Sequence, residues 1–435
     1  MSKQKISIFW FRRDLRLNDN CGLYNALKGN FPVLPIFIFD KNILDDLSNK
    51  QDARVSFIHR ELSAINEALK DKETGLRTFY ATPEEAFQTI LSEYNIQTVH
   101  TNRDYEPYAT KRDEEIKTLL LEHDVQFKTY KDQVIFERDE IVKDDGTPYL
   151  VYTPYSKKWL SSLKDEMLSP YTSGLQFENW VHIKNSTIIT LEDMGFQKSS
   201  ISIPSSNLTD HTLHVYESER NFPAKDSTSR LGIHLRFGTV SIRALAQKTK
   251  NKSETFLKEL IWREFFMMIL FHYPKVIDHN FNAKYDALEW RNNKEDFEKW
   301  KKGETGFPLV DAGMRELNET GFMHNRVRML VASFLTKHLL IDWRWGEAYF
   351  AEKLLDYDLA ANNGNWQWAA GTGVDAAPYF RIFNPESQIE KFDKQKTYIK
   401  RWVKDIQELS YPHPMVDHKF ARQRALEAYK RAIQQ

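Results

Sequence analysis

The sequence predicts two domains of different class, a parallel α/β domain followed by an all-helical domain, joined by a long connector. The chain has 435 residues, which is more than one ordinary hydrophobic core accommodates. Its first part alternates short apolar runs with helical patterns, whereas its last part shows mainly apolar spacing of three and four. We therefore expect the α/β domain over residues 1–130, the connector over 131–204 and the helical domain over 205–435.

The α/β domain is expected to hold a parallel, Rossmann-like sheet. Its strands are expected at 6–11, 33–39, 77–80, 98–101 and 125–129, and its helices at 54–70, 83–94 and 107–122. Thr82 can cap the second of these helices, Pro83 suits its first position and Glu85 can close a capping box. Trp10-Phe-Arg-Arg-Asp14 follows the first strand where a glycine-rich loop would stand, which argues against a dinucleotide site.

The connector is rich in Ser, Thr, Pro and Asp, and one short helix is expected within it at 154–164. The helices of the last domain are expected at 243–248, 254–272, 310–320, 325–341, 346–355 and 422–432. Pro274 ends the second of them.

Composition excludes several classes of protein. The single cysteine, Cys21, rules out an intramolecular disulfide and fits a reducing compartment. The sequence has no signal-peptide pattern and no apolar run of the roughly 18–20 residues that a membrane span needs. We expect a cytoplasmic protein, associated with the nucleoid if the source is bacterial. No metal site is expected, because His272, His279, His324 and His338 lack paired ligand spacing.

The charge distribution favours the last domain as the docking place of a polyanion. The net charge is zero, but residues 205–435 carry 35 Lys and Arg against 30 Asp and Glu. A chance imbalance of this size is the alternative.

Two helical patterns combine residue types that a packed core does not need. Glu259, Trp262 and Arg263 share one helix face, which suits stacking on a base, hydrogen bonding and phosphate binding. Asn325 and Met329 repeat the same spacing with Arg328. The alternatives are an exposed ion pair beside a packed Trp for the first pattern, and ordinary core filling by methionine for the second.

Further along the chain, Asp358-Leu-Ala-Ala-Asn-Asn-Gly-Asn-Trp-Gln-Trp368 also mixes Trp, Asn and Asp with small residues, as Gly321–Met329 does. This mixture suits a flat, charged, redox-active cofactor beside a flat substrate. Both segments, together with Glu259–Phe265 and Tyr379–Pro385, closely resemble the flavin-binding half of the photolyase/cryptochrome family. The nearest branch is the microbial class I cyclobutane pyrimidine dimer photolyases, and the resemblance begins at Trp10–Arg16 and runs to the end of the chain.

The resemblance implies a light-driven DNA repair lyase. Excited, reduced FAD would donate an electron to a pyrimidine dimer, which photolyases, an established example of base flipping, extrude from the duplex. The implied partner is DNA containing pyrimidine dimers, with no membrane and no obligatory protein partner, so a monomer is expected.

The resemblance also assigns residues to substrate and DNA. Glu259 would contact the pyrimidine carbonyl edge and the adenine amino group, while Asn325 and Met329 would contact the dimer. Trp262 and Trp368 would clamp the dimer from two sides, and Arg326 would bind phosphate. The DNA-binding set is Trp262, Arg263, Arg326, Met329 and Trp368.

For FAD, the resemblance places Asn362 opposite flavin N5 and pairs Arg328 with Asp356. The implied FAD set is Tyr216, Thr228, Ser229, Arg230, Leu231, Gly232, Phe256, Glu259, Arg263, Asn325, Arg328, Asp356, Tyr357, Asp358 and Asn362. Residues 228–232 match a phosphate-binding loop, which a helix start suits. A Thr-Ser pair, or an Asn near a helix start, is also an ordinary helix cap.

Trp366, Trp343 and Trp290 match a row of three tryptophans that carries electrons to the flavin in this family. The catalytic set implied is thus Glu259, Asn325, Met329, Asn362, Trp290, Trp343 and Trp366. The alternative is three core aromatics.

Residues 106–113 resemble family members that bind a deazaflavin or flavin antenna, and Ala109 stands where folate-binding relatives carry Glu. A second chromophore (deazaflavin, flavin or folate) is therefore expected, with an empty cleft as the alternative.

Two other functions remain as alternatives within the family. A cryptochrome-like photoreceptor is disfavoured by Asn362, since plant cryptochromes carry Asp there. Repair of the (6-4) photoproduct would want a His pair near Asn325 and Met329. Tyr357, Asn365 and Phe322 depart from common family residues and would affect the surroundings of the flavin.

Overall fold

The computed structural model describes residues 3–434, which pack into two compact units. Unit 1 takes in the chain up to Glu137, Leu163–Ser206 and Leu231–Asn251. Unit 2 takes in Arg138–Ser162, Asn207–Arg230 and the chain from Lys252 onward. Both units therefore draw on the connector and on the segment after it, while the domain limits at 130 and 204 remain a prediction.

A five-stranded parallel sheet of order β3-β2-β1-β4-β5 forms the centre of unit 1, as the sequence predicted. The strands are β1 (Lys5–Phe11), β2 (Val33–Asp40), β3 (Arg77–Ala81), β4 (Asn95–Asn102) and β5 (Gln126–Tyr130). In the register, Ser7 of β1 lies opposite Val33 of β2 and Thr98 of β4. This is the order of a doubly wound sheet, with its topological switch point between β1 and β4.

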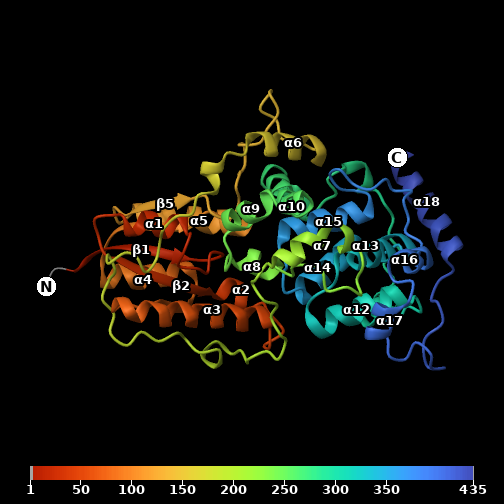
Figure 1. The fold of residues 1–435 in the computed structure, drawn as a ribbon, viewed down its shortest axis with the longest axis horizontal. Helices are drawn as coiled ribbons and strands as arrows, with labels where there is room; N and C mark the ends of the chain where they lie inside the picture. Colours follow the sequence, from red (N-terminus) through yellow and green to blue (C-terminus); the bar gives the residue numbers. More distant parts are fainter. Residues whose placement is uncertain (1–2, 435) are drawn as a thin grey trace. The chain divides into compact units, whose positions relative to one another are not determined.

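Helices cover both faces of this sheet because successive strand residues point to opposite faces (Figure 1). Phe9, Phe11 and Phe37 pack with α1 (Cys21–Leu27) and α3 (Ala53–Leu69). Ile8, Trp10, Leu34 and Ile36 pack with α4 (Pro83–Glu93) and α5 (Pro107–Leu121). The capping box predicted at Thr82 and Glu85 is present at the start of α4.

Unit 1 also holds α2 (Lys41–Leu44), α8 (Gly232–Phe237) and α9 (Ile242–Lys250), with short 3-10 turns at Lys70–Lys72, Asp165–Leu168 and Glu192–Met194.

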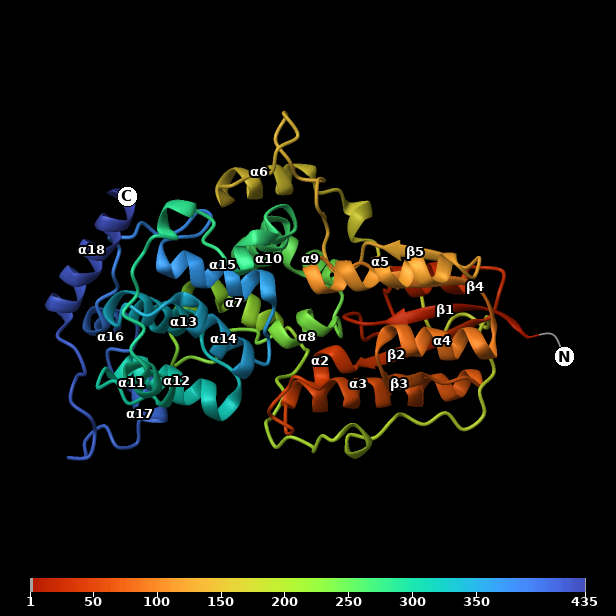
Figure 2. The ribbon, with the colours of Figure 1, turned by 180° about the vertical axis from the view of Figure 1, so that it is seen from behind.

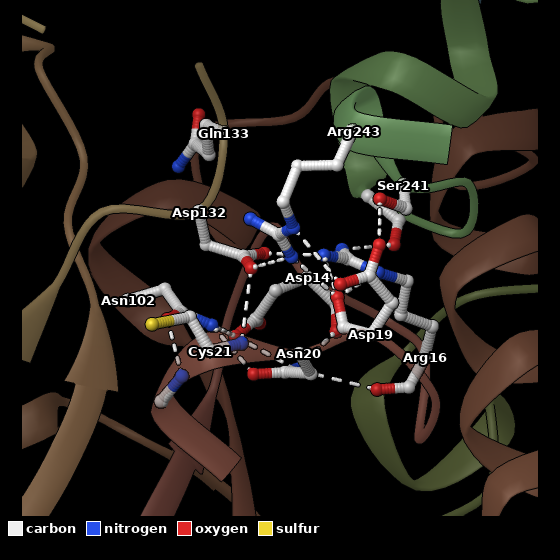
Figure 3. A network of polar contacts seen from close by, with 12 residues as sticks. Asp14, Arg16, Asp19, Asn20, Cys21, Asn102, Asp132, Gln133, Ser241 and Arg243 are labelled. Carbon is white, nitrogen blue, oxygen red and sulfur yellow. Dashed lines mark hydrogen bonds and ion pairs between the residues drawn. The ribbon is translucent and has the colours of Figure 1, made fainter. Parts of the chain in front are cut away.

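A buried ion network ties α9 to the carboxyl-terminal side of the sheet (Figure 3). The guanidinium of Arg243 donates to Asp19 Oδ1 and to Asp132 Oδ1, each at 2.8 Å, and Arg16 donates to Asp132 Oδ2 at 2.6 Å. Burial by itself would raise the pKa of Asp132, but Arg16 and Arg243 outweigh it and hold that pKa below its ordinary value. The network thus binds residues that follow β1 and β5 to a helix from much later in the sequence.

Unit 2 is built from helices and short turns. They are α6 (Tyr152–Ser162), α7 (Asp210–Glu219), α10 (Glu254–His272), α11 (Lys294–Lys302), α12 (Pro308–Thr320), α13 (Asn325–Ser333), α14 (Trp343–Lys353), α15 (Leu359–Ala370), α16 (Pro385–Phe392), α17 (Thr397–Trp402) and α18 (His418–Gln434), with 3-10 turns at Pro274–Ile277 and Ala283–Tyr285. Helices α11, α12 and α17 lie side by side, and α10, α13 and α14 pack on α15 (Figure 2).

The sequence missed the short helices and one change of helix type. Helices α1, α2, α7, α8, α11, α16 and α17 have ten residues or fewer, so their apolar periodicity is too brief to stand out. The helix expected at 325–341 is α-helical only to Ser333 and continues as a π-helical turn, Phe334–His338. Leu340, at φ 51°, then ends it.

Within residues 3–434, no helix is long and apolar enough to cross a bilayer. No group of three or more His, Cys, Asp or Glu in this part of the chain could hold a metal ion.

Replacing Arg243 by Met is expected to lower the free energy of unfolding by about 3–5 kcal/mol, because it leaves the buried Asp19 carboxylate without its cation and Asp132 with Arg16 alone. Lys70→Met, at an exposed pair with Glu67, should change it by less than about 1 kcal/mol. Urea unfolding followed by circular dichroism measures both. Equal, small losses would show that the buried network contributes little.

Candidate functional site

A cavity of about 590 Å³ lies among α13, α14 and α15 of unit 2. It is lined by Asn325, Arg328, Met329, Ala332, Phe350, Leu354, Asp356, Tyr357, Asp358, Ala361, Asn362, Asn365, Trp366, Trp368 and Ala369. We call it the inner cavity. Its wall is mainly apolar, with a few amide, carboxylate and guanidinium groups, which is the usual composition of a cofactor site.

A wider cavity of about 1230 Å³, the outer cavity, shares part of that wall. Asn325, Met329, Ala361, Asn365 and Trp368 line both cavities. The remaining lining residues of the outer cavity are Tyr216, Arg220, Asn221, Thr228, Glu259, Trp262, Arg263, Phe266 and Arg326. The shared residues would therefore touch a ligand in either cavity.

The expected pair of Arg328 and Asp356 is present in the inner cavity, with Arg328 Nη2 and Asp356 Oδ2 2.9 Å apart. Arg328 Nε also donates to the carbonyl oxygen of Met323 at 2.7 Å. The other carboxylate oxygen of Asp356 is buried and has no hydrogen-bond partner in the structure. Because a buried acceptor is normally satisfied, this oxygen fits a hydrogen-bond donor on a bound cofactor.

The amide of Asn362 is oriented by Glu347. Asn362 Nδ2 donates to Glu347 Oε1 at 2.8 Å and to the Glu347 carbonyl oxygen at 3.1 Å. Its amide oxygen is thereby left as the group that can accept from a ligand. Burial raises the pKa of Glu347. The alternative of Asn362 as a helix cap is wrong, since Asp358 caps α15 by accepting from Ala361 N–H at 3.2 Å.

Helix α10 presents Glu259, Trp262 and Arg263 together on the wall of the outer cavity. Glu259 forms an ion pair with Arg220 of α7, which the sequence analysis did not single out. Arg220 stands one turn after Tyr216, and that spacing is the signal that could have found it. Trp262 and Trp368 of α15 both line this cavity, and their clamping of a dimer remains a prediction.

Helix α13 supplies two of the five residues common to both cavities and one further cation. Asn325 and Met329 line both cavities, so the alternative of Met329 as mere core filling is disfavoured. Arg326 lines the outer cavity, where it donates to Asn221 Oδ1, and its guanidinium lies 4.5 Å from the ring centroid of Phe392.

The structure places the residues of the expected phosphate loop in different surroundings. Tyr216 and Thr228 reach the outer cavity, and Phe256 is buried against the Tyr216 ring with centroids 4.9 Å apart. Arg230 lies over Phe322 at 4.6 Å. Ser229 stands between Thr228 and Arg230, Leu231 is buried, and Gly232 opens α8.

The three tryptophans of the expected electron row occupy one apolar cluster. Trp366 lines the inner cavity, Trp343 is fully buried with its indole N–H donating to Asn280 Oδ1 at 2.9 Å, and Trp290 is half-buried at the cluster's edge. Trp300, with its ring centroid 6.2 Å from that of Trp366, also packs there. Trp366 and Trp343 are thus both buried, and Trp290 is the most exposed of the three.

His324 fixes the start of α13. Its Nδ1 accepts from the backbone N–H of Arg326 at 3.1 Å, which makes it the cap of the helix that carries Asn325, Arg328 and Met329. Burial lowers the pKa of His324 to about 4, and Arg328 and Arg326 act in the same direction. The sequence analysis had not given His324 a role, since histidine is an uncommon cap.

Unit 1 has a separate cavity of about 1210 Å³ beside β2, α4 and α5. Its lining residues are Asn42, Thr82, Pro83, Glu84, Tyr108, Arg112, Glu115, Ile116, Thr118, Leu119 and Glu122. The Tyr108 hydroxyl donates to Asp40 Oδ2 at 2.5 Å, and the Arg112 guanidinium lies 4.9 Å from the ring centroid of Trp10. Residues 106–113, expected at an antenna site, thus contribute to a cavity.

Comparisons with known proteins agree with this geometry. The family model of the FAD binding domain of DNA photolyase matches residues 256–410, and the DNA photolyase model matches residues 7–172. A deoxyribodipyrimidine photo-lyase of Agrobacterium fabrum is 36% identical, and the alignment covers 97% of each chain. The chain belongs to the photolyase/cryptochrome family and, within it, has full-length relatives named deoxyribodipyrimidine photo-lyase.

Solved structures share the whole fold. A bacterial class III photolyase from Agrobacterium tumefaciens superposes with a TM-score of 0.88 at 33% identity, over 100% of this chain and 99% of that one. An archaeal photolyase from Sulfolobus tokodaii, crystallised with two FAD molecules, gives 0.87 at 35% identity, over 98% and 100%. A cryptochrome from Synechocystis gives 0.87 at 25% identity, over 98% and 100%. The fold class predicted from the sequence, an α/β domain and a helical FAD-binding domain, is confirmed.

Lowering the pH below about 6.5 is expected to destabilise the fold through His324. The folded protein holds this ring neutral down to pH about 4, whereas the unfolded chain takes up the proton near the ordinary value of 6.5. The part of the free energy of unfolding that comes from keeping His324 neutral is therefore complete above pH 6.5 and is lost as the pH falls toward 4. Urea unfolding at about pH 7, 6 and 5 measures it.

The control is His324→Asn, which keeps a capping oxygen without titrating in this range. Its free energy of unfolding should fall less steeply with pH than that of the wild type. His100 and His338, whose pKa values burial also lowers, contribute equally in both proteins. Identical slopes would contradict the role given to His324.

Proposed function

We propose that this protein is a light-dependent deoxyribodipyrimidine photo-lyase that uses FAD to reverse cyclobutane pyrimidine dimers in DNA. The observation that carries the proposal is the pair of joined cavities in unit 2. One is smaller, mainly apolar and supplied with fixed polar groups, and the other is wider and has Trp262 and Trp368 on its wall. A redox cofactor in the first would share Asn325 and Met329 with a substrate in the second.

The inner cavity fits FAD through groups of this chain alone. Arg328 and Asp356 would hold polar edges of the cofactor, Asn362 would accept a hydrogen bond at the ring, and Tyr357 and Asp358 would complete the wall. By resemblance to the family, Tyr216 and Thr228, which line the outer cavity, would hold the phosphates together with Ser229 and Arg230. When bound, FAD supplies the light-driven electron transfer that opens the cyclobutane ring.

The outer cavity would hold the flipped-out dimer. Trp262 and Trp368 stack against its rings, an interaction with a typical strength of about 1–3 kcal/mol per base. Glu259, held by Arg220 as a carboxylate, accepts at the base edge, and Arg263 and Arg326 neutralise DNA phosphate. The residues thus bind and orient the dimer and exclude water from it.

The second chromophore, the location in the cell and the oligomeric state are assigned from the family resemblance and the sequence. We infer a second chromophore, a deazaflavin, flavin or folate, at the unit 1 cavity beside Tyr108 and Arg112. The protein acts as a cytoplasmic monomer without an obligatory partner. A photoreceptor function is disfavoured by Asn362 and by the open cavity walled by Trp262.

The proposal predicts that purified, FAD-loaded and reduced protein restores the absorbance of thymine dimers near 260 nm under blue light and not in the dark. Light is required because the cofactor must absorb a photon before it can transfer an electron. Absorbance of a dimer-containing oligonucleotide is followed in matched light and dark samples. Absence of recovery in light, with FAD content verified, would refute the repair function.

Trp366→Phe is expected to block photoreduction of the oxidised cofactor while leaving repair by chemically reduced protein nearly intact. Trp366 lines the inner cavity and shares one apolar cluster with Trp343 and Trp290. A phenyl ring is much harder to oxidise than an indole. Flash absorption spectroscopy on oxidised and pre-reduced samples separates the two processes.

Trp402→Phe is the matched control, because Trp402 packs on the same core cluster without lining either cavity. It should retain photoreduction at the wild-type rate. If Trp366→Phe behaves like this control, the three tryptophans are core aromatics and the electron row is refuted.

A further inference from the structure

Trp262, one of the two tryptophans on the outer cavity, has a stacking partner in the connector that has no assigned role. The ring of Tyr152, at the start of α6, lies parallel to Trp262, with ring centroids 3.6 Å apart and planes 5° apart. Tyr152 is only 8% exposed. Helices α6 and α10 lie together in unit 2 (Figure 2). One face of Trp262 is therefore covered by protein, and a flat ligand in the outer cavity can stack only on the other face.

Tyr152 is itself held at both ends. Its hydroxyl donates to the carbonyl oxygen of Lys258 at 2.8 Å, within α10, four residues before Trp262. Its backbone N–H donates to Asp375 Oδ2 at 3.0 Å. Asp375, at φ 45°, follows the end of α15, the helix that carries Trp368. The Tyr152 ring, which packs on Trp262, is thus hydrogen-bonded through its backbone to the segment that follows the helix carrying Trp368.

The helix α6 does not depend on Tyr152 for its attachment. Tyr155 is 1% exposed and packs on Phe265 with ring centroids 5.3 Å apart. The indole N–H of Trp159 donates to the buried Glu264 at 2.6 Å. Both contacts anchor α6 on α10 without touching Trp262, so the contact of Tyr152 with Trp262 is separate from the packing that holds the helix.

We propose that Tyr152 is a positioning residue for DNA recognition, which holds the Trp262 indole in its stacking orientation before the dimer arrives. The inference rests on the proposed repair function. An indole that is already fixed loses little side-chain entropy on binding, which preserves affinity for the stacked ligand. Phe266 and Phe265 border the same indole at centroid distances of 5.6 Å and restrict its rotation further. Undamaged duplex, which presents no extruded base, gains nothing from this arrangement.

The test is dark binding of the FAD-loaded protein to a dimer-containing oligonucleotide and to its undamaged counterpart, measured by fluorescence anisotropy. Tyr152→Leu should weaken binding of the damaged oligonucleotide by roughly three- to tenfold, as expected for one unfixed side chain, and leave undamaged binding unchanged. Tyr152→Phe keeps the stacked ring and should restore the wild-type ratio of affinities. Tyr152→Met replaces the Leu variant if that variant does not fold.

Two controls separate positioning from general packing. Trp159→Phe, on the same helix, removes the hydrogen bond to Glu264 and should lower thermal stability while leaving the ratio of damaged to undamaged affinity unchanged. In a Trp262→Ala background, Tyr152→Leu should have no further effect on damaged-DNA affinity, because the side chain through which it acts is gone. An undiminished effect in that background, or an unchanged ratio in the single variant, would overturn the positioning role. A wild-type protein without preference for the dimer would instead overturn the repair function, and with it this inference.

Discussion

The close approach of α15 to α10 and α14 is the constraint on which the site in unit 2 depends. A Cβ atom at Gly346 would lie 2.1 Å from the Trp366 ring, and one at Gly364 would lie 2.2 Å from the Phe266 ring. Both distances are far inside van der Waals contact, so only glycine permits the observed packing. Because α15 carries Asn362, Trp366 and Trp368, its position sets the inner cavity, the proposed electron row and one wall of the outer cavity together.

Fixed polar pairs then complete the walls that this packing creates. Arg328 is held by Asp356, Glu259 by Arg220, and the Asn362 amide by Glu347. Each pair satisfies its own groups while leaving an oxygen or a face toward a cavity, so little reorganisation is needed when ligands bind. His324 contributes indirectly, since its ring caps the helix that supplies Asn325 and Met329, two of the residues shared by both cavities.

The segments between the main elements have structural roles in both units. In unit 1, the carboxyl-terminal side of the sheet, where doubly wound folds commonly bind nucleotides, carries the network of Arg16, Asp19, Asp132 and Arg243. In unit 2, α6 of the connector places Tyr152 under Trp262. A connector with weak periodicity and many polar residues therefore contributes a defined contact to the proposed DNA-binding wall.

The sequence by itself determined the fold class, all five strands and most of the long helices, because burial imposes periods of two and 3.6 that survive in the residue order. Helix α15 was not among the helices that it predicted. Spacing on a shared helix face singled out Glu259 with Trp262 and Asn325 with Met329, whereas their roles and the choice of Asn362 came from the resemblance to the family. Only the tertiary structure decided which side chains meet across distant segments. Arg220 with Glu259, Glu347 with Asn362, Tyr152 with Trp262 and Arg243 with Asp19 are contacts between elements whose packing no local pattern encodes. The division of residues 228–232 between cavity, packing and helix start likewise depends on where α8 docks, which is a property of the folded chain.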